Sequence, residues 1–306
     1  MTQLGLQRAH LRGDRRLCQP EHLGGPGQGA GAVDGVERVQ QVETHHAIDF
    51  PMAACRLSSW SPMACPGQSS GRGEHRGEDE TMARILIGLT SHGDLGGLRA
   101  TGYYLPEAAH PWHVFTEAGH EVEFASVAGG EPPVDGVDLS DPIQKAFTED
   151  EGVRAKVAGT PRFADLDPAG YDAVLFAGGH GAMWDFPGDE GLIRFGRGVY
   201  EQGGVVAAVC HGPAALVGLT LSDGTPVVAG KRVAGFTDSE EAAAGLTEVV
   251  PFLLQTTLEK LGGKHSGAAD WQPHVVTDGR LVTGQNPASS TGVAEEVLKV
   301  LSTSKR

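Results

Sequence analysis

The most reactive side chain of the sequence is a cysteine that stands where an apolar run meets a turn. Residues 205–209 are apolar, and Cys210 and His211 follow them directly. Pro213 suits the first turn of a helix, where its missing N–H is not needed. The pattern predicts that Cys210 lies on a strand-to-helix turn, the geometry of a nucleophile elbow, although Ala208 stands where that motif has glycine. Amide groups at the helix start are then expected to favour the thiolate, which is the nucleophilic form.

A glycine pair follows another apolar run. Gly178 and Gly179 come after residues 173–177, and their lack of side chains lets backbone N–H groups approach a reacting oxygen closely. The turn lacks both the lysine and the spacing of a phosphate-binding loop. Purely structural alternatives stay open for Cys210 and for the glycine pair. A lone cysteine is commonly buried and inert, and residues 178–179 could form an ordinary glycine-rich turn.

Two histidines raise the question of a metal site. His110 and His113 stand three residues apart on a predicted helix and, with Glu107, imitate a His/His/carboxylate set. Pro111 interrupts that helix, and the neighbouring aromatic residues indicate an apolar face against which histidines pack. We therefore predict no catalytic metal and no cofactor, and we expect His180 to shape the pocket.

Apolar strands and amphipathic helices alternate from residue 84 onward. An Asp-Gly pair between two β-branched runs predicts a hairpin at 275–282. The order predicts a doubly wound α/β fold, a flavodoxin-like sandwich with a mostly parallel sheet and helices on both faces. The expected strands are 85–89, 121–127, 173–177, 205–209 and 233–236; the expected helices are 107–118, 191–202, 213–216, 252–261 and 294–301; an acidic irregular region separates the second and third strands.

The first 81 residues differ in composition from the rest of the 306-residue chain. They contain no lysine and no tyrosine, and they show no sustained period of a strand or a helix. Such a segment cannot bury enough apolar surface to offset its chain entropy. We expect 1–81 to be a disordered extension or an artefact of the gene boundary, with translation starting at Met82, and 82–306 to be the folded domain.

The net charge and the cysteine spacing indicate which classes of binding partner and which cellular compartment to expect. Residues 82–306 carry 16 basic and 29 acidic residues, which argues against a nucleic-acid partner because a phosphate backbone requires a basic surface. The other cysteines, Cys18, Cys55 and Cys65, form no CxxC pair. Neither an apolar run of membrane-spanning length nor a signal-peptide core is present, so we predict a cytoplasmic protein with no membrane partner.

Five short motifs resemble one protein superfamily. The motifs are Glu107 to Pro111, Ala177 to Gly181, Ala208 to Ala214, Gly235 to Asp238 followed by Glu241, and Asp278 to Ser289. In this order they are similar to the class I glutamine-amidotransferase-like superfamily. The nearest branch is the glyoxalase III and stress-chaperone group, relatives of the PfpI protease and the Parkinson-linked deglycase. The resemblance extends from Arg84 to Leu301.

The resemblance implies a catalytic triad. Cys210 would be the nucleophile, His211 its partner, and Glu241 the carboxylate that orients the histidine. Glu240 and Asp238 compete with Glu241 for the orienting role, because all three stand close together in the same motif.

Two further roles follow from the same resemblance. Glu107 would accept and donate a proton beside the cysteine; its structural alternative is a helix-start carboxylate that interacts with the helix dipole. The amides of Gly179 and His211 would form an oxyanion hole.

The implied activity is conversion of methylglyoxal, or another small 2-oxoaldehyde, to the 2-hydroxy acid without glutathione, by a homodimer. One enzymatic alternative uses the same nucleophile as an amidase, peptidase or protein deglycase. A third alternative is a holding chaperone or redox sensor, in which Cys210 reports oxidation.

Overall fold

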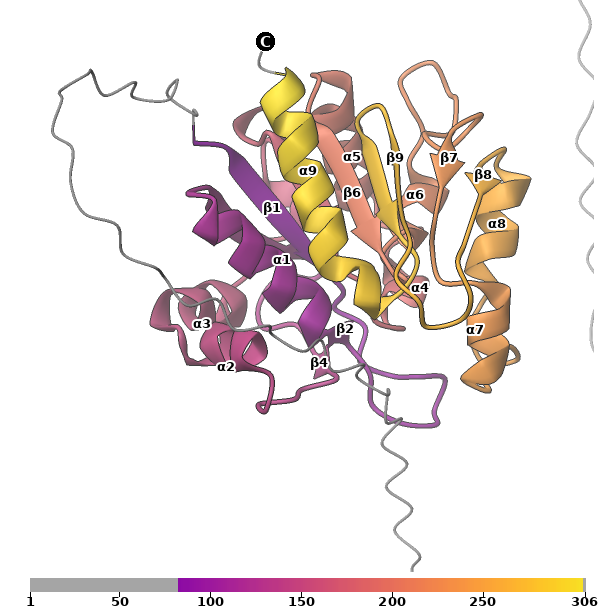
Figure 1. Ribbon diagram of the computed structural model, residues 1–306, viewed down its shortest axis with the longest axis horizontal. Helices are drawn as coiled ribbons and strands as arrows, with labels where there is room; N and C mark the ends of the chain where they lie inside the picture. Colours follow the sequence, from indigo (N-terminus) through magenta and orange to yellow (C-terminus); the bar gives the residue numbers. More distant parts are fainter. Residues whose placement is uncertain (1–81, 305–306) are drawn as a thin grey trace, which may run out of the picture. The chain divides into compact units, whose positions relative to one another are not determined.

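A six-stranded sheet lies at the centre of the computed structural model, which describes residues 82–304 (Figure 1). The predicted extension 1–81 lies outside the described residues. The strand order is β3-β1-β5-β6-β10-β9. All neighbouring pairs are parallel except the last, which is the predicted hairpin. The strands are β1 (Arg84–Leu89), β3 (Glu121–Ser126), β5 (Ala173–Phe176), β6 (Val205–Val209), β9 (Val275–Asp278) and β10 (Leu281–Gly284).

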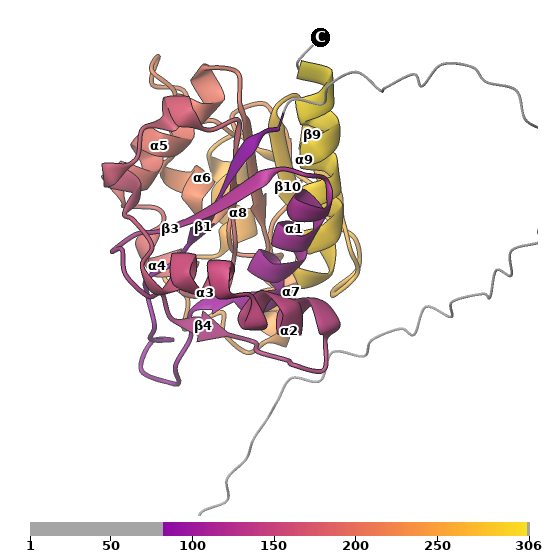
Figure 2. The same ribbon diagram turned by 90° about the vertical axis from the view of Figure 1, so that its left-hand side faces the viewer.

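Helices cover both faces of this sheet, as the sequence predicts. Helices α1 (Leu105–Glu117) and α9 (Ser290–Ser304) lie on one face, and α5 (Glu190–Glu201) lies on the other (Figure 2). Strands β5 and β6 are buried along their whole length, which explains why they appear as unbroken apolar runs instead of alternating ones. The doubly wound α/β fold is therefore confirmed.

The region between β3 and β5 is more regular than predicted. It contains two helices, α2 (Pro142–Glu149) and α3 (Glu151–Ala158), where the sequence suggested irregular chain. Each begins at an aspartate whose side chain accepts backbone N–H groups of the first turn, Asp141 for α2 and Asp150 for α3. These caps satisfy amides that a helix start leaves without partners, so acidic residues here mark helix starts.

The predicted strand 233–236 is wrong in extent and in place. Only β7 (Arg232–Val233) is extended, and it pairs with β8 (Lys264–His265) in a separate two-stranded sheet. Beyond β7 the backbone donors go elsewhere: Ala234 N donates to Thr283 Oγ1, and Phe236 N donates to the Cys210 carbonyl at 2.9 Å. The segment is thereby tied to the cysteine turn instead of extending a sheet.

Short elements complete the described part of the chain. Strands β2 (Tyr103–Tyr104) and β4 (Val134–Asp135) pair in parallel. The remaining helices are α4 (Ala182–Asp185), α6 (Ala214–Gly218), α7 (Asp238–Ala243) and α8 (Leu254–Lys260). Within residues 82–304, no helix combines the length and the apolar character needed to cross a membrane.

A chain that begins at Met82 is expected to fold as the full-length protein does, because the buried apolar residues from Ala83 to Leu301 form one core. Its unfolding midpoint should lie within about 3 °C of that of the full chain, a difference of ~1 kcal/mol for a domain of this size. Differential scanning calorimetry of both chains measures this. A midpoint lowered by about 10 °C, or loss of the cooperative transition, would show that residues 1–81 stabilise the domain.

Candidate active site

Cys210 occupies a sharp turn directly after β6. Its φ of 59° lies in the left-handed region, which among the described non-glycine residues only Trp271 shares. A bulky residue is held there only when its surroundings dictate it. Here the Cys210 amide donates to the Gly284 carbonyl at 3.0 Å, and the Cys210 carbonyl accepts from Phe236. The predicted elbow geometry is present, and backbone hydrogen bonds to strand β10 and to Phe236 hold it in place.

The glycine after His211 lets the elbow approach the neighbouring strand. A Cβ atom on Gly212 would lie 2.1 Å from the Phe176 carbonyl oxygen at the end of β5. Pro213 follows as the N-cap residue of α6. The turn is therefore packed tightly against β5, whose own continuation is the Gly178-Gly179 turn.

His211 connects the cysteine to a carboxylate. Its Nδ1 lies 3.4 Å from the Cys210 sulfur, and its Nε2 lies 2.9 Å from Oε2 of Glu241 in the first turn of α7. Because a carboxylate can only accept, Nε2 carries the proton and Nδ1 presents its lone pair to the sulfur. The three side chains are all buried. They form a Cys-His-Glu arrangement in which the imidazole can accept the thiol proton.

Burial sets the charge of the histidine and its carboxylate. Burial, followed by the neighbouring His180, lowers the pKa of His211 to about 4. Burial alone would raise the pKa of Glu241, but hydrogen bonds from His180 and His211 lower that pKa to about 2. Near neutral pH the pair is therefore a neutral imidazole beside a carboxylate.

Glu107 brings a second carboxyl group to the cysteine from another part of the chain. It lies in the first turn of α1 and is fully buried. Its Oε2 accepts a hydrogen bond from the Gly178 amide at 2.7 Å. Its Oε1 has no well-aligned hydrogen bond within residues 82–304, and the side chain that interacts with the carboxyl group is Cys210. One oxygen is thus held in place and, within the described residues, the other has no hydrogen-bond partner, in a carboxyl group that interacts with the cysteine side chain.

The buried pair of Glu107 and Cys210 resists ionisation. Burial raises the pKa of Glu107 to about 8, although the Cys210 and Gly178 hydrogen bonds oppose this. Burial, and then the Glu107 carboxylate, raise the pKa of the Cys210 thiol. The expectation that helix-start amides favour the thiolate is therefore wrong for the resting protein. Desolvation of the sulfur outweighs the His211 amide, which acts in the opposite direction.

The two amides predicted to form an oxyanion hole lie at the ends of adjacent strands. Gly179 has a φ of 95°, and a Cβ atom there would lie 2.2 Å from the Gly102 carbonyl oxygen. Neither the Gly179 amide nor the His211 amide donates to another backbone group within the described part of the chain. The Gly178 amide is already used by Glu107.

The competing carboxylates near Glu241 have other partners. Asp238 bonds to the amide and hydroxyl of Thr256, at the start of α8. Glu240 is fully buried, and its oxygens accept hydrogen bonds from Thr237, Trp271, Gln285 and Asn286 at 2.8–3.1 Å. Of the three acidic side chains, Glu241 alone contacts His211.

The histidines considered for a metal do not converge with Glu107. His110 Nε2 lies 2.7 Å from Asp141 Oδ2, next to α2, and His113 contacts the Trp112 ring. His180, expected only to shape the pocket, lies 3.1 Å from Glu241 Oε1 through its Nε2. A 61-residue separation hides this contact from sequence patterns, although the placement of His180 directly after the glycine turn was a usable signal.

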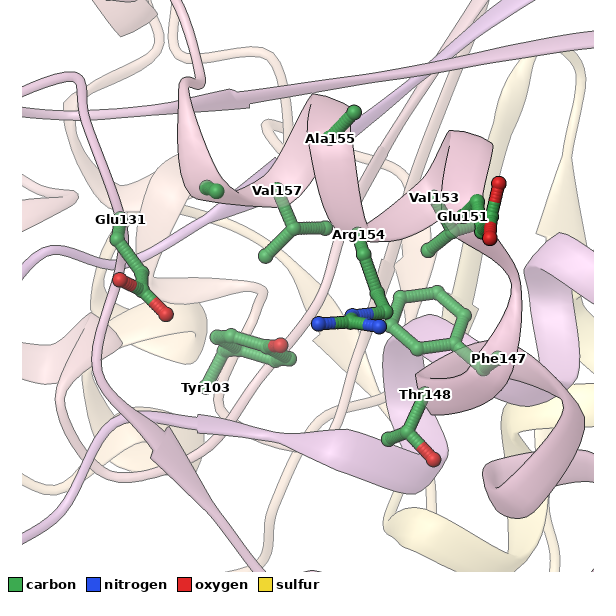
Figure 3. A pocket seen from close by; sticks show the side chains of 10 residues that line it. Tyr103, Glu131, Phe147, Thr148, Glu151, Val153, Arg154, Ala155 and Val157 are labelled. Carbon is green, nitrogen blue, oxygen red and sulfur yellow. The ribbon is translucent and has the colours of Figure 1, made fainter.

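A separate hollow lies between the β2–β4 segment and helices α2 and α3. Tyr103, Glu131, Phe147 and Arg154 are among its lining residues (Figure 3). None of the side chains around Cys210 lines it. It is therefore distinct from the site described above.

Comparison with known proteins places this chain in a family. Residues 98–300 match the DJ-1/PfpI family, and the chain belongs to that family. Its resemblance to the class I glutamine-amidotransferase-like superfamily, in the glyoxalase III group, is thereby confirmed.

Individual relatives are similar over nearly their whole length. Glyoxalase 3 of Candida albicans is 34% identical over 230 residues, covering 71% of this chain and 98% of that protein. Glutathione-independent glyoxalase HSP31 of Saccharomyces cerevisiae is 33% identical over 236 residues, with the same two coverages. The crystal structure of the Candida glyoxalase III superposes with a TM-score of 0.67 at 33% identity, covering 72% of this chain and 97% of that one. The Rapid Encystment Protein of Francisella tularensis superposes with a TM-score of 0.70 at 35% identity, covering 72% and 99%.

Glu240→Gln is expected to lower the free energy of unfolding by about 3 kcal/mol, because an amide NH₂ would face donors that now meet a buried carboxylate. The exposed Glu248→Gln on the following loop serves as the control and should change it by less than ~0.5 kcal/mol. Urea unfolding of the three proteins measures the difference. Equal stability of the two variants would show that the Glu240 hydrogen bonds do not hold this turn.

Proposed function

We propose that the protein is a glutathione-independent glyoxalase, which converts methylglyoxal or a related small 2-oxoaldehyde to the 2-hydroxy acid. Cys210 acts as nucleophile, His211 as its proton partner, and Glu241 as the carboxylate that orients His211. The names of the Candida and Saccharomyces relatives support this activity. The amides of Gly179 and His211 are proposed to stabilise the negative oxygen of the intermediates.

One observation carries the proposal: a buried carboxyl group lies beside the nucleophile with one oxygen unused. Glu107 is fixed through Oε2 by the Gly178 amide, Oε1 has no hydrogen-bond partner within residues 82–304, and the carboxyl group interacts with Cys210. A cysteine hydrolase needs only the nucleophile, its histidine and donors for the oxyanion. Moving hydrogen from one carbon of a substrate to the next requires an additional acid and base, and a carboxyl group with a pKa near the operating pH suits that task.

The steps balance without an external oxidant or reductant. The Cys210 sulfur bonds to the aldehyde carbon, and the thiol proton passes through His211 Nδ1 to the new hydroxyl, which gives a hemithioacetal. Glu107 removes the hydrogen from that carbon and returns a proton to the adjacent carbonyl carbon through an enediolate, while the hydroxyl proton of the hemithioacetal moves to the oxygen of that second carbon. The first carbon is thereby oxidised to a thioester and the second is reduced to an alcohol.

Hydrolysis completes the cycle. A water molecule attacks the thioester with His211 as general base, the C–S bond breaks, and the sulfur regains its proton. The product is the 2-hydroxy acid. The redox change is internal to the substrate, so the proposed reaction uses no glutathione, nicotinamide or catalytic metal.

The partner and location of the protein remain predictions. We propose that the protein is a homodimer located in the cytoplasm. Its small-molecule partner is the 2-oxoaldehyde substrate. Leu98, Val137 and Leu139 have exposed apolar side chains, which a contact between copies would cover. The strong net charge of −15 supports the absence of a nucleic-acid partner.

Glu107→Gln is expected to lower 2-oxoaldehyde turnover ~100-fold or more while Cys210 stays reactive towards iodoacetamide, because the amide keeps the shape but cannot accept a proton. The exposed Glu117→Gln, at the other end of α1, is the control and should retain wild-type turnover. Hydroxy-acid formation and alkylation are measured in parallel. If Glu107→Gln retained full turnover, or if Cys210→Ser did, the mechanism would be wrong.

The same variants separate the proposal from the amidase and deglycase alternative. An amidase built on Cys210, His211 and Glu241 would keep its activity on amide substrates in Glu107→Gln, since that chemistry does not need Glu107. We expect no appreciable amide or glycated-peptide hydrolysis by the wild type. Efficient hydrolysis that survives Glu107→Gln, without hydroxy-acid formation, would favour the alternative.

Turnover is expected to rise about tenfold per pH unit up to about pH 8 and then level off. Glu107 must be ionised to accept the carbon-bound hydrogen, and burial raises its pKa to about 8, so the active base form gains as pH rises. His211, with a pKa near 4, stays neutral over this range. A profile of kcat/KM against pH measures this, and an ascending limb near pH 4.5, the ordinary carboxyl range, would contradict it.

A further inference from the structure

Two histidines share the Glu241 carboxylate, and the proposed reaction uses only one of them. His211 Nε2 lies 2.9 Å from Oε2, and His180 Nε2 lies 3.1 Å from Oε1. The two imidazole rings are 4.1 Å apart between centroids, tilted by 41°. The two nitrogens and the carboxylate oxygen all lie within 4.8 Å of one another, and this is the one such three-ligand cluster found within residues 82–304.

We propose that His180, His211 and Glu241 form an inhibitory zinc site, which takes Zn²⁺ in place of the hydrogen bonds that now join them. Two imidazole nitrogens and one carboxylate oxygen are the ligand set of open zinc sites, which leave a fourth position for water. Tetrahedral ligands at about 2.05 Å from zinc are about 3.3 Å apart. One ligand atom from each of the three residues already lies within 4.8 Å of the others, so side-chain shifts of an ångström or two would bring the three atoms to about that spacing.

The three ligands come from three separate parts of the fold. His180 belongs to the turn after β5, His211 to the elbow after β6, and Glu241 to the first turn of α7. The sheet and α7 therefore hold the ligands in place before an ion arrives. A preorganised set of this kind binds more tightly than the same residues on flexible loops.

Access to the cluster is from the His180 side. The His180 side chain is 16% exposed, whereas those of His211 and Glu241 are 1% and 2% exposed. An ion from solvent meets His180 first. His180 is thus both a ligand and the residue whose replacement disturbs the buried pair least.

Zinc binding and the proposed catalysis exclude each other at one imidazole. In both histidines, Nε2 now carries the proton that it donates to Glu241. Zinc binding at Nε2 requires this proton to move to Nδ1 of the same ring. In His211 the protonated Nδ1 then faces the Cys210 sulfur, 3.4 Å away. It can no longer accept the thiol proton, and Glu241 no longer orients the ring for that purpose.

The donor set selects among metals. Imidazole nitrogens suit zinc, copper and nickel, whereas magnesium and calcium take oxygen ligands. The cysteine sulfur faces Nδ1, on the other side of the His211 ring from the three donor atoms. It is therefore not a ligand, which distinguishes this site from a thiolate zinc site.

Isothermal titration of the full chain with zinc chloride tests the proposal. The chain contains other histidines and cysteines, so the comparison is between variants. Relative to wild type, His180→Gln should lose one equivalent of bound zinc or bind it at least about tenfold more weakly. His113→Gln, which alters a histidine of α1 outside the cluster, should bind zinc like wild type. Cys210→Ser should also retain the equivalent.

Cobalt(II) absorption gives a second measurement that does not depend on turnover. Wild type and Cys210→Ser should show the ligand-field bands of tetrahedral cobalt without sulfur charge-transfer bands, and His180→Gln should lack the bands. Thermal melting checks that each variant folds; if His180→Gln does not, Glu241→Gln takes its place. Identical zinc stoichiometry and affinity in wild type and the folded variant would overturn the site.

The inhibitory consequence depends on the proposed glyoxalase activity. Zinc should suppress 2-oxoaldehyde turnover by wild type and His113→Gln at concentrations that fill the site, and it should suppress the residual turnover of His180→Gln at least about tenfold less effectively. Zinc binding with unchanged turnover would overturn the inhibitory role. If zinc-free wild type had no turnover, the proposed function would fail, and the titration would still decide the zinc site.

Discussion

The thiol of Cys210 and the carboxyl group of Glu107 are both buried, one on the elbow and the other in the first turn of α1. The properties of the rest of the site depend on the free-energy cost of placing a charge on either group. Burial raises the pKa of both Cys210 and Glu107, so the resting pair holds its protons. The Gly178 amide offsets part of that cost by fixing one oxygen of Glu107. Charge develops only when a substrate carbonyl accepts it, which is when donors at the strand ends are most effective.

The sheet brings these groups together from distant parts of the chain. Glu107 and Gly178 are 71 residues apart, and His211 and Glu241 are 30 apart. Parallel strands β5 and β6 end at the same edge, which puts the glycine turn beside the elbow. Glu240 has a different task from its neighbour, because its hydrogen bonds join the 235–240 turn to the 271 loop and the end of β10, and so hold α7 where Glu241 can contact His211.

Sequence reasoning predicted the fold class and most elements because buried parallel strands are apolar along their whole length. It failed where the local sequence pattern and the tertiary contacts disagree. The residues around Phe236 have the apolar pattern of a strand, but the Phe236 amide donates its hydrogen bond to the Cys210 carbonyl. It placed Cys210, His211 and Glu107 in one site through motifs, and Glu241 only as one of three alternatives. The raised pKa of the thiol and the His180–Glu241 contact depend on burial and on chain segments far apart, which spacing along the chain does not encode.

The central claim is that the aldehyde carbon of a 2-oxoaldehyde is oxidised while its neighbour is reduced, within one substrate molecule bound to Cys210. Methylglyoxal labelled with ¹³C at the aldehyde carbon, supplied to the purified protein without glutathione or nicotinamide, tests it by NMR. The label should appear in the carboxyl group of the 2-hydroxy acid, at one product per aldehyde consumed, and Cys210→Ser should form none. Label that accumulates in protein adducts, with no labelled hydroxy acid beyond one equivalent of protein, would contradict the account.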